Sequence, residues 1–185
     1  MVGSGSSFFK KGYCLSDKTF KLYFQQAPGA IAYFIPAMDH GPSTIDCLMF
    51  QYEVQIRVRY SETDQMGYVY YGNYGAYFEV ARTEAFRSLG INYREMELSG
   101  IMMPVLEMKT RYLRPARYDD LLTIKMMLPT KPKGTRITFE YEVQNEANEL
   151  LTKGETTLVF VDMNTNRPIP LPESVTGKLD RYYQL

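Results

Sequence analysis

Between Met49 and Leu185 the sequence carries one long stretch with helical periodicity, and this stretch limits the folds that are open to the chain. Apolar residues recur there at the three- and four-residue spacing of one helix face: Tyr74, Tyr77, Phe78, Ala81, Ala85 and Leu89. Asn73 stands at the N-cap position, and Gly90 follows the last apolar residue, as a C′ glycine does. One long helix has one apolar stripe to bury, so the other elements must supply the surface that covers it.

The segments on either side of this helix indicate β-strands. From Tyr52 to Tyr60 apolar and polar residues alternate, which is typical of a strand with one buried face. A short second helix is expected at Asn92–Gly100, and four strands are expected after it: Val105–Arg114, Leu121–Leu128, Thr135–Val143 and Leu150–Val161. Lys133-Gly134 and Asn145–Asn148 have the composition of meander turns, and the proline-rich tail Arg167–Pro172 predicts an extended chain. We therefore predict an α+β fold, a long helix packed on a five-stranded antiparallel sheet.

Residues 1–48 differ from the rest, because they begin with a Gly/Ser cluster and lack sustained periodicity. Their apolar stretch Ala30–Met38 is too short to span a bilayer, and the segment has neither the apolar run of a secretory signal nor the arginines of a mitochondrial presequence. Three interpretations stay open: a poorly ordered extension, a weak targeting peptide, or upstream sequence outside the functional chain. We favour the third, with residues 49–185 as a cytoplasmic domain and no membrane span.

The chemistry available to residues 49–185 is restricted, because His40, Cys14 and Cys47 all precede Met49. Because residues 49–185 contain no His and no Cys, they cannot form a Ser-His triad, a Cys nucleophile or a metal site with His or Cys ligands. The whole chain has 21 Lys+Arg and 21 Asp+Glu, a balance that argues against a nucleic-acid partner. Carboxylates, hydroxyls, basic side chains and backbone N–H groups remain.

One carboxylate, that of Asp64, lies in the loop Ser61–Gly72 between the first strand and the long helix. The residues around Tyr71–Asn73 are expected to place free backbone N–H groups at the start of that helix, where the helix dipole favours a developing negative charge. A carboxylate beside such a donor is a minimal hydrolase for an activated carbonyl such as a thioester. The alternative role for Asp64 is an Asx turn, since loop aspartates commonly form turns.

The stretch from Arg59 to Glu84 reads R-x-x-E-T-D-x-x-G-x-V-Y-Y-x-N-Y-x-x-Y-F-E-x-A-R-x-E. It resembles the signature of the hotdog acyl-CoA thioesterases that are like 4-hydroxybenzoyl-CoA thioesterase. The resemblance extends from Phe50 to Val175, and it includes the Arg114–Asp120 segment and the Arg167–Pro172 ending.

This resemblance implies a hotdog fold, in which a sheet wraps a long helix and subunits pair into homodimers and often homotetramers. It implies that Asp64 is the catalytic carboxylate, acting as a nucleophile through a mixed anhydride or as a general base on water. The backbone N–H of Tyr71 would polarise the thioester carbonyl, at a site between subunits. No metal or bound organic cofactor is expected, and CoA enters only as part of the substrate.

The chain departs from the family pattern at two positions, Tyr68 and Tyr71, where many relatives carry a histidine. A tyrosine donates a hydrogen bond but is a poor base at neutral pH, so the demand on Asp64 is greater. Glu79 is a reserve carboxylate if it faces the cleft, and otherwise an ion-pair partner of Arg82.

Further candidates are expected to bind the substrate. Tyr68 and Gly72 lie next to the catalytic segment. Lys133 and Arg136 belong to a basic turn that is either a clamp for the CoA phosphates or a solvated turn, and Arg111, Arg114 and Arg117 are similar candidates. We predict a thioesterase that hydrolyses small or medium acyl-CoA substrates. The alternatives are a non-catalytic acyl-thioester binding protein and a hotdog dehydratase or hydratase.

Overall fold

The computed structural model describes residues 49–183, so the interpretations of residues 1–48 lie outside it. The main strands are β1 (Phe50–Arg57), β3 (Val105–Tyr112), β4 (Leu121–Leu128), β5 (Arg136–Gln144) and β6 (Leu150–Val159). Three two-residue strands complete the list: β2 (Ile101–Met102), β7 (Val161–Asp162) and β8 (Arg167–Pro168). The helices are α1 (Tyr74–Ser88), α2 (Tyr93–Leu98) and α3 (Glu173–Leu179), with short 3₁₀ turns η1 (Tyr60–Glu62), η2 (Tyr71–Asn73) and η3 (Asp180–Tyr182).

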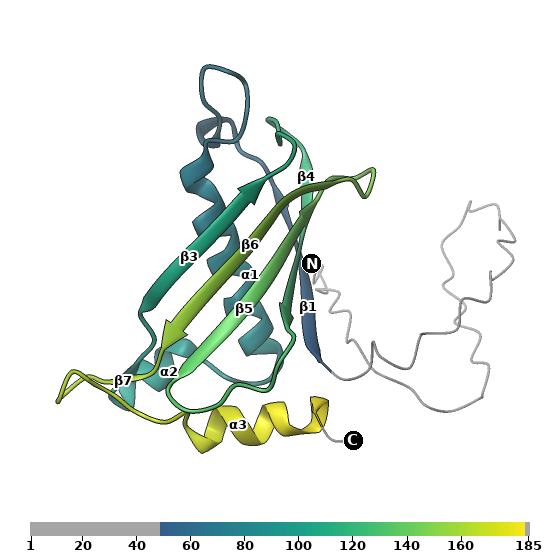
Figure 1. The fold of residues 1–185 in the computed structure, drawn as a ribbon. Coiled ribbons are helices and arrows are strands. Elements are labelled where there is room, and N and C mark those ends of the chain that lie inside the picture. The colour runs from purple at the N-terminus through teal and green to yellow at the C-terminus, as the bar shows by residue number, and fades with distance from the viewer. Residues whose placement is uncertain (1–48, 184–185) are drawn as a thin grey trace, which may run out of the picture. The chain divides into compact units, whose positions relative to one another are not determined.

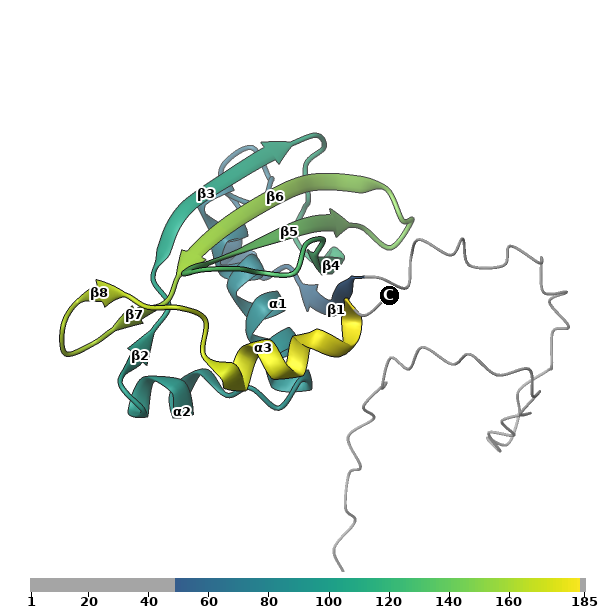
Figure 2. The ribbon, with the colours of Figure 1, turned by 60° about the horizontal axis from the view of Figure 1, so that its bottom comes forward.

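The five long strands form one antiparallel sheet in the order β1-β4-β5-β6-β3. Helix α1 lies across one face of this sheet (Figure 1). Seen from the end of the molecule, the sheet curves around α1 (Figure 2). The predicted α+β hotdog arrangement is therefore confirmed, and the second small sheet, β2-β7-β8, is an addition that the sequence did not predict.

The core forms between α1 and the sheet, and all six residues of the predicted stripe are buried. The Phe78 ring stacks on the Tyr141 ring, with 4.4 Å between their centres. Gly154 of β6 makes this packing possible, because a Cβ at that position would lie 2.3 Å from Cζ of Phe78. A glycine under the middle of the helix thus lets α1 approach the sheet closely.

Three of the four ends of α1 and α2 follow the sequence signals. Gly90 has a φ of 70° directly after α1, as expected of a C′ glycine, and Gly100 has a φ of 88° after α2. The side chain of Asn92 caps α2 by accepting from the Arg94 N–H at 3.0 Å. Asn73 holds the predicted N-cap position of α1 but makes no cap bond; its amide donates instead to the carbonyl oxygen of Glu62.

Two sequence predictions about the fold were wrong in detail, and one helix was not predicted. The first strand ends at Arg57 and the chain turns into η1, so Tyr60 is 80% exposed rather than buried. Strand β6 ends at Val159, and Val161 pairs with Met102 in the small sheet. The tail Arg167–Pro172 is extended as predicted, but it leads into α3, which buries Val175 and Leu179 and was not predicted. No helix within residues 49–183 combines the length and apolar character needed to cross a bilayer.

Candidate active site

Asp64 lies at the tip of a tight loop that follows β1 and η1. The two sides of this loop meet in an isolated bridge between Thr63 and Val69, and the Asp64 N–H donates to the Tyr68 carbonyl at 2.9 Å. The Gly67 N–H donates back to the Asp64 carbonyl at 2.9 Å, with Gly67 at a φ of 73°. This left-handed conformation favours glycine, so the Gly of the sequence motif is explained by the turn.

The Asp64 carboxylate is half-buried, and its two oxygens have different surroundings. Oδ1 accepts from the Met66 N–H at 2.8 Å and from the Tyr68 N–H at 3.4 Å, which is the Asx-turn role expected of a loop aspartate. Among residues 49–183, Oδ2 accepts no hydrogen bond. The turn therefore orients the carboxylate through one oxygen and leaves the other available for chemistry.

The start of α1 presents two backbone donors. Residues 71–73 form η2 directly before the helix, and the N–H groups of Tyr71 and Gly72 have no partner within the described range. The peptide unit that carries the Tyr71 N–H is fixed at its carbonyl end, because Tyr70 O accepts from the Asn73 N–H at 3.0 Å. The unit that carries the Gly72 N–H is fixed in the same way, because Tyr71 O accepts from the Tyr112 hydroxyl at 3.2 Å. Two oriented donors at a helix start suit a developing oxyanion.

Glu62 joins the Asp64 loop to the helix. Its carbonyl oxygen accepts from the Tyr70 N–H at 2.9 Å and from the Asn73 amide at 2.7 Å. Its carboxylate accepts from the Tyr77 hydroxyl at 2.8 Å. Burial, and then the bond to Glu62, raise the pKa of Tyr77 well above its usual range, so this hydroxyl remains a donor. Sequence reasoning gave Glu62 no role, although it is the glutamate of the R-x-x-E-T-D motif and lies two residues before Asp64.

Tyr68 and Gly72 both lie in this segment, as the sequence analysis expected. The Tyr68 ring is half-buried, and the Arg117 guanidinium lies 4.9 Å from its centre, so this arginine is engaged by an aromatic ring. A Cβ on Gly72 would lie 2.8 Å from the Tyr70 ring, so Gly72 allows that ring to fold over the helix start. The Tyr70 and Tyr71 rings, 4.4 Å apart, form an exposed aromatic rim beside the two backbone donors.

Glu79 is exposed on α1, and no ion pair connects it to Arg82 in the part of the chain that the structure describes. Arg82 is buried, because it follows Phe78 by four residues on the inner stripe and lies beside the phenols of Tyr93 and Tyr141. The ion-pair alternative for Glu79 was therefore wrong. Its role as a reserve carboxylate stays a prediction.

Lys133 and Arg136 lie at the opposite end of the sheet from Asp64. The pair Arg57–Leu121 marks the end from which the Asp64 loop leaves, whereas the pair Phe50–Leu128 marks the end where β4 leads into the basic turn. Eight strand residues separate these ends by about 25 Å. The structure does not bring the two groups together within one chain. Arg114 pairs with Glu149, and Arg111 lies on the sheet.

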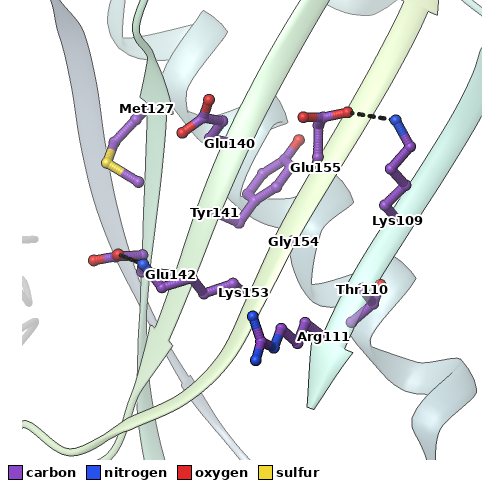
Figure 3. A pocket seen from close by; sticks show the side chains of 10 residues that line it. All are labelled: Lys109, Thr110, Arg111, Met127, Glu140, Tyr141, Glu142, Lys153, Gly154 and Glu155. Carbon is purple, nitrogen blue, oxygen red and sulfur yellow. Dashed lines mark hydrogen bonds and ion pairs between the residues drawn. The ribbon is translucent and has the colours of Figure 1, made fainter. Parts of the chain in front are cut away.

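Asp64 and Tyr71 line neither of two cavities that open on the surface of residues 49–183. A groove of about 850 Å³ runs between β1 and α1 and is lined in part by Arg59, Glu62 and Tyr77. A hollow of about 320 Å³ lies on β3, β5 and β6, where Lys109 pairs with Glu155 (Figure 3). The second hollow is rich in charged side chains and is typical of a solvated sheet face.

The edge strand β3 presents exposed apolar side chains beside the helix start. Within the described residues it pairs only with β6, and every residue except Thr110 is exposed. Its large apolar side chains are Val105, Leu106, Met108 and Tyr112. The sulfur of Met108 lies near Gly75, and Tyr112 bonds Tyr71, so this open edge borders the two backbone donors.

The comparison with protein families matches residues 58–179 to a family described as the thioesterase-like superfamily. A protein described as putative acyl-CoA thioesterase YneP from Bacillus subtilis (strain 168) is 35% identical over 115 residues, 62% of this chain and 83% of that protein. The acyl-CoA thioester hydrolase YbgC from Escherichia coli O6:H1 is 34% identical over 123 residues, 66% of this chain and 91% of that protein.

Solved structures with a similar fold include a protein described as a thioesterase. The structure described as a DHNA-CoA thioesterase from Staphylococcus aureus superposes with a TM-score of 0.62 and 36% identity, covering 64% of this chain and 79% of that one. A hypothetical protein from Thermus thermophilus superposes with a TM-score of 0.66 and 30% identity, and the match covers 71% of this chain and 98% of that one. The expectation of a thioesterase-family enzyme with a hotdog fold is confirmed, and the chain belongs to the thioesterase-like superfamily.

Proposed function

We propose that this protein is an acyl-CoA thioesterase, which hydrolyses the thioester of a small or medium acyl-CoA to a free acid and CoA. The observation that carries the proposal is the pair of oriented N–H groups of Tyr71 and Gly72, which find no partner within residues 49–183, in the segment that also holds Asp64. Relatives at 35% and 34% identity, described as a putative acyl-CoA thioesterase and as an acyl-CoA thioester hydrolase, support the substrate class.

In the proposed reaction the thioester oxygen accepts from the Tyr71 N–H, with the Gly72 N–H as a second donor. These bonds stabilise the negative charge that develops on that oxygen when the carbonyl carbon is attacked. The attacking atom is either Oδ2 of Asp64, giving a mixed anhydride that water then opens, or a water oxygen whose proton Asp64 removes. In both cases the C–S bond breaks and the sulfur leaves as the CoA thiolate. In the nucleophilic route the thiolate takes its proton from solvent water, and in the general-base route it takes the proton that Asp64 removed. No metal or bound cofactor is required.

A complete site calls for a second subunit. Within residues 49–183, Asp64 lines neither the groove nor the hollow, whereas the exposed strand β3, with its four large apolar side chains, lies beside the helix start. Unpaired strand edges with apolar side chains favour pairing with another strand. We propose a homodimer, or a tetramer built from two such dimers, in which a partner covers β3 and closes the acyl site. Lys133 and Arg136 would reach a CoA phosphate only on a different subunit from the reacting Asp64.

The experiment is a panel of acyl-CoA substrates from short to medium chain and aromatic, assayed for release of free thiol. It is carried out on the full chain and, in parallel, on a chain that begins at Met49. Saturable thiol release supports the proposal. Binding of acyl-CoA with no thiol release supports the non-catalytic alternative instead, and loss of water from 3-hydroxyacyl thioesters supports a dehydratase. A cytoplasmic location and the role of residues 1–48 stay predictions from the sequence.

A further inference from the structure

We propose that Glu62 is a positioning residue, which fixes the Asp64 loop at a set distance from the N–H groups at the start of α1. This inference rests on the proposed function. It assigns to Glu62 no contact with the substrate, only the task of holding two parts of the site together.

The carboxylate of Glu62 ties the loop to the helix. One oxygen, Oε2, accepts from the Tyr77 hydroxyl at 2.8 Å and from the Arg59 N–H at 2.8 Å. Tyr77 lies one turn inside α1, and the Glu62 side chain is only 17% exposed. Hydrogen bonds to a carboxylate are stronger than those between neutral groups, and little of this side chain is exposed to competing water, so this link is firm.

The main chain of Glu62 makes a second link. Its carbonyl oxygen accepts from the N–H of Tyr70 at 2.9 Å and from the side-chain amide of Asn73 at 2.7 Å. Glu62 precedes the Asp64 loop and Tyr70 follows it, so one residue holds both ends of the loop. Asn73 belongs to η2, the turn that presents the two free N–H groups. The four donors around Glu62 therefore come from all the segments that build the site.

The consequence for catalysis follows from the spacing. Asp64 comes two residues after Glu62, and the Tyr71 N–H comes directly after Tyr70. Loss of the carboxylate leaves the backbone bonds but releases the loop from Tyr77 and Arg59. A shift of the order of 1 Å in a reacting group lowers the rate by as much as ~100-fold. The turnover number kcat should fall while KM stays near the wild-type value, because Glu62 is not assigned to substrate binding.

The opposing interpretation is that Glu62 itself acts as an acid or base, since it lines the groove between β1 and α1. Glu62→Gln separates the two. The amide oxygen of glutamine has two lone pairs and accepts from both Tyr77 and Arg59, but the side chain cannot take up a proton at neutral pH. Positioning predicts kcat within about threefold of wild type for Glu62→Gln and a loss of about 10- to 100-fold for Glu62→Ala.

Two tyrosine variants complete the test. Tyr77→Phe removes one donor to Glu62 without enlarging the core, and it should lower kcat by about three- to tenfold with little change in KM. Tyr183→Phe is the matched control, because its half-buried hydroxyl donates to the carbonyl of Leu128 at the far end of the sheet. It should leave kcat unchanged. All variants are assayed well below their unfolding temperatures, measured by circular dichroism.

Three results decide the outcome. A lowered kcat for Glu62→Ala with recovery in Glu62→Gln supports the positioning role. An unchanged kcat for folded Glu62→Ala and Tyr77→Phe overturns it, and so does an equal loss in Glu62→Gln and Glu62→Ala, which assigns Glu62 to the chemistry. If the wild-type protein releases no thiol from any acyl-CoA, the proposed function itself has failed.

Discussion

Gly154→Ala should destabilise the fold strongly, because Gly154 sets the distance between α1 and the sheet. An ideal Cβ at this position would lie 2.3 Å, 2.5 Å and 3.1 Å from three ring atoms of Phe78. Carbon atoms pack at about 3.5–4.0 Å, so the ring must retreat by more than ~1 Å. Phe78 is fully buried and stacks on Tyr141, so it has no space to enter. Overpacking of this kind costs up to about 3 kcal/mol.

The assay is urea unfolding of wild type and variant at one protein concentration. With a slope of about 2 kcal/mol per molar, a loss of ~3 kcal/mol lowers the midpoint by about 1.5 M. Gly177→Ala is the control, because nothing lies within 4 Å of its Cβ in α3, and alanine should stabilise that helix by up to ~1 kcal/mol. The double variant Gly154→Ala/Phe78→Leu should lose less free energy of unfolding than the sum of the losses of the two single variants. If the free energy of unfolding of Gly154→Ala lies within ~0.5 kcal/mol of the wild-type value, this account of the packing is refuted.

Two other predictions concern alkaline stability and subunit pairing. Burial raises the pKa of Tyr183 to about 12, above its ordinary value of 10.0, so its contribution to stability is complete below pH 10 and is lost as the pH rises through 12. Tyr183→Phe should therefore flatten the fall of the urea midpoint over that window, and an unchanged slope would contradict the burial of this hydroxyl. Met108→Glu places a charge on the open β3 edge beside Gly75, and it should shift the protein toward monomers in sedimentation and lower thiol release together. A Met108→Glu protein that pairs as wild type does would exclude this edge as the interface.

The sequence predicted those parts of the fold in which many residues repeat one pattern. The stripe from Tyr74 to Leu89 is buried in full, and β4 has the predicted bounds Leu121–Leu128. Patterns of two or three residues carry too little information, so the small sheet β2-β7-β8 was not found. In the sequence, Tyr60 continues the alternating pattern of β1, but in the structure it is the first residue of η1. Local pattern does not show where tertiary contacts end a strand.

The candidate site was predictable where chemistry follows from local position. Asp64 in its loop and the Tyr71 N–H at the helix start lie in the predicted segment. The role of Glu62 could not be predicted, because its partners Tyr70, Asn73 and Tyr77 lie 8 to 15 residues away and meet it only through the fold. The separation of Lys133 from Asp64 likewise depends on strand order, which no motif reveals.

The most direct test of the account compares Asp64→Asn with Asp162→Asn. Asparagine at position 64 keeps an oxygen that accepts from the Met66 N–H, so the turn persists while the nucleophile or base is lost. Asp162 is a matched control, because its Oδ1 accepts from Asn164 and Thr165 in a similar turn on β7. We predict that thiol release from acyl-CoA falls by about 100-fold or more in Asp64→Asn and is unchanged in Asp162→Asn. A folded Asp64→Asn protein that hydrolyses acyl-CoA at the wild-type rate would contradict the catalytic role of Asp64. Its role would then be limited to forming the Asx turn.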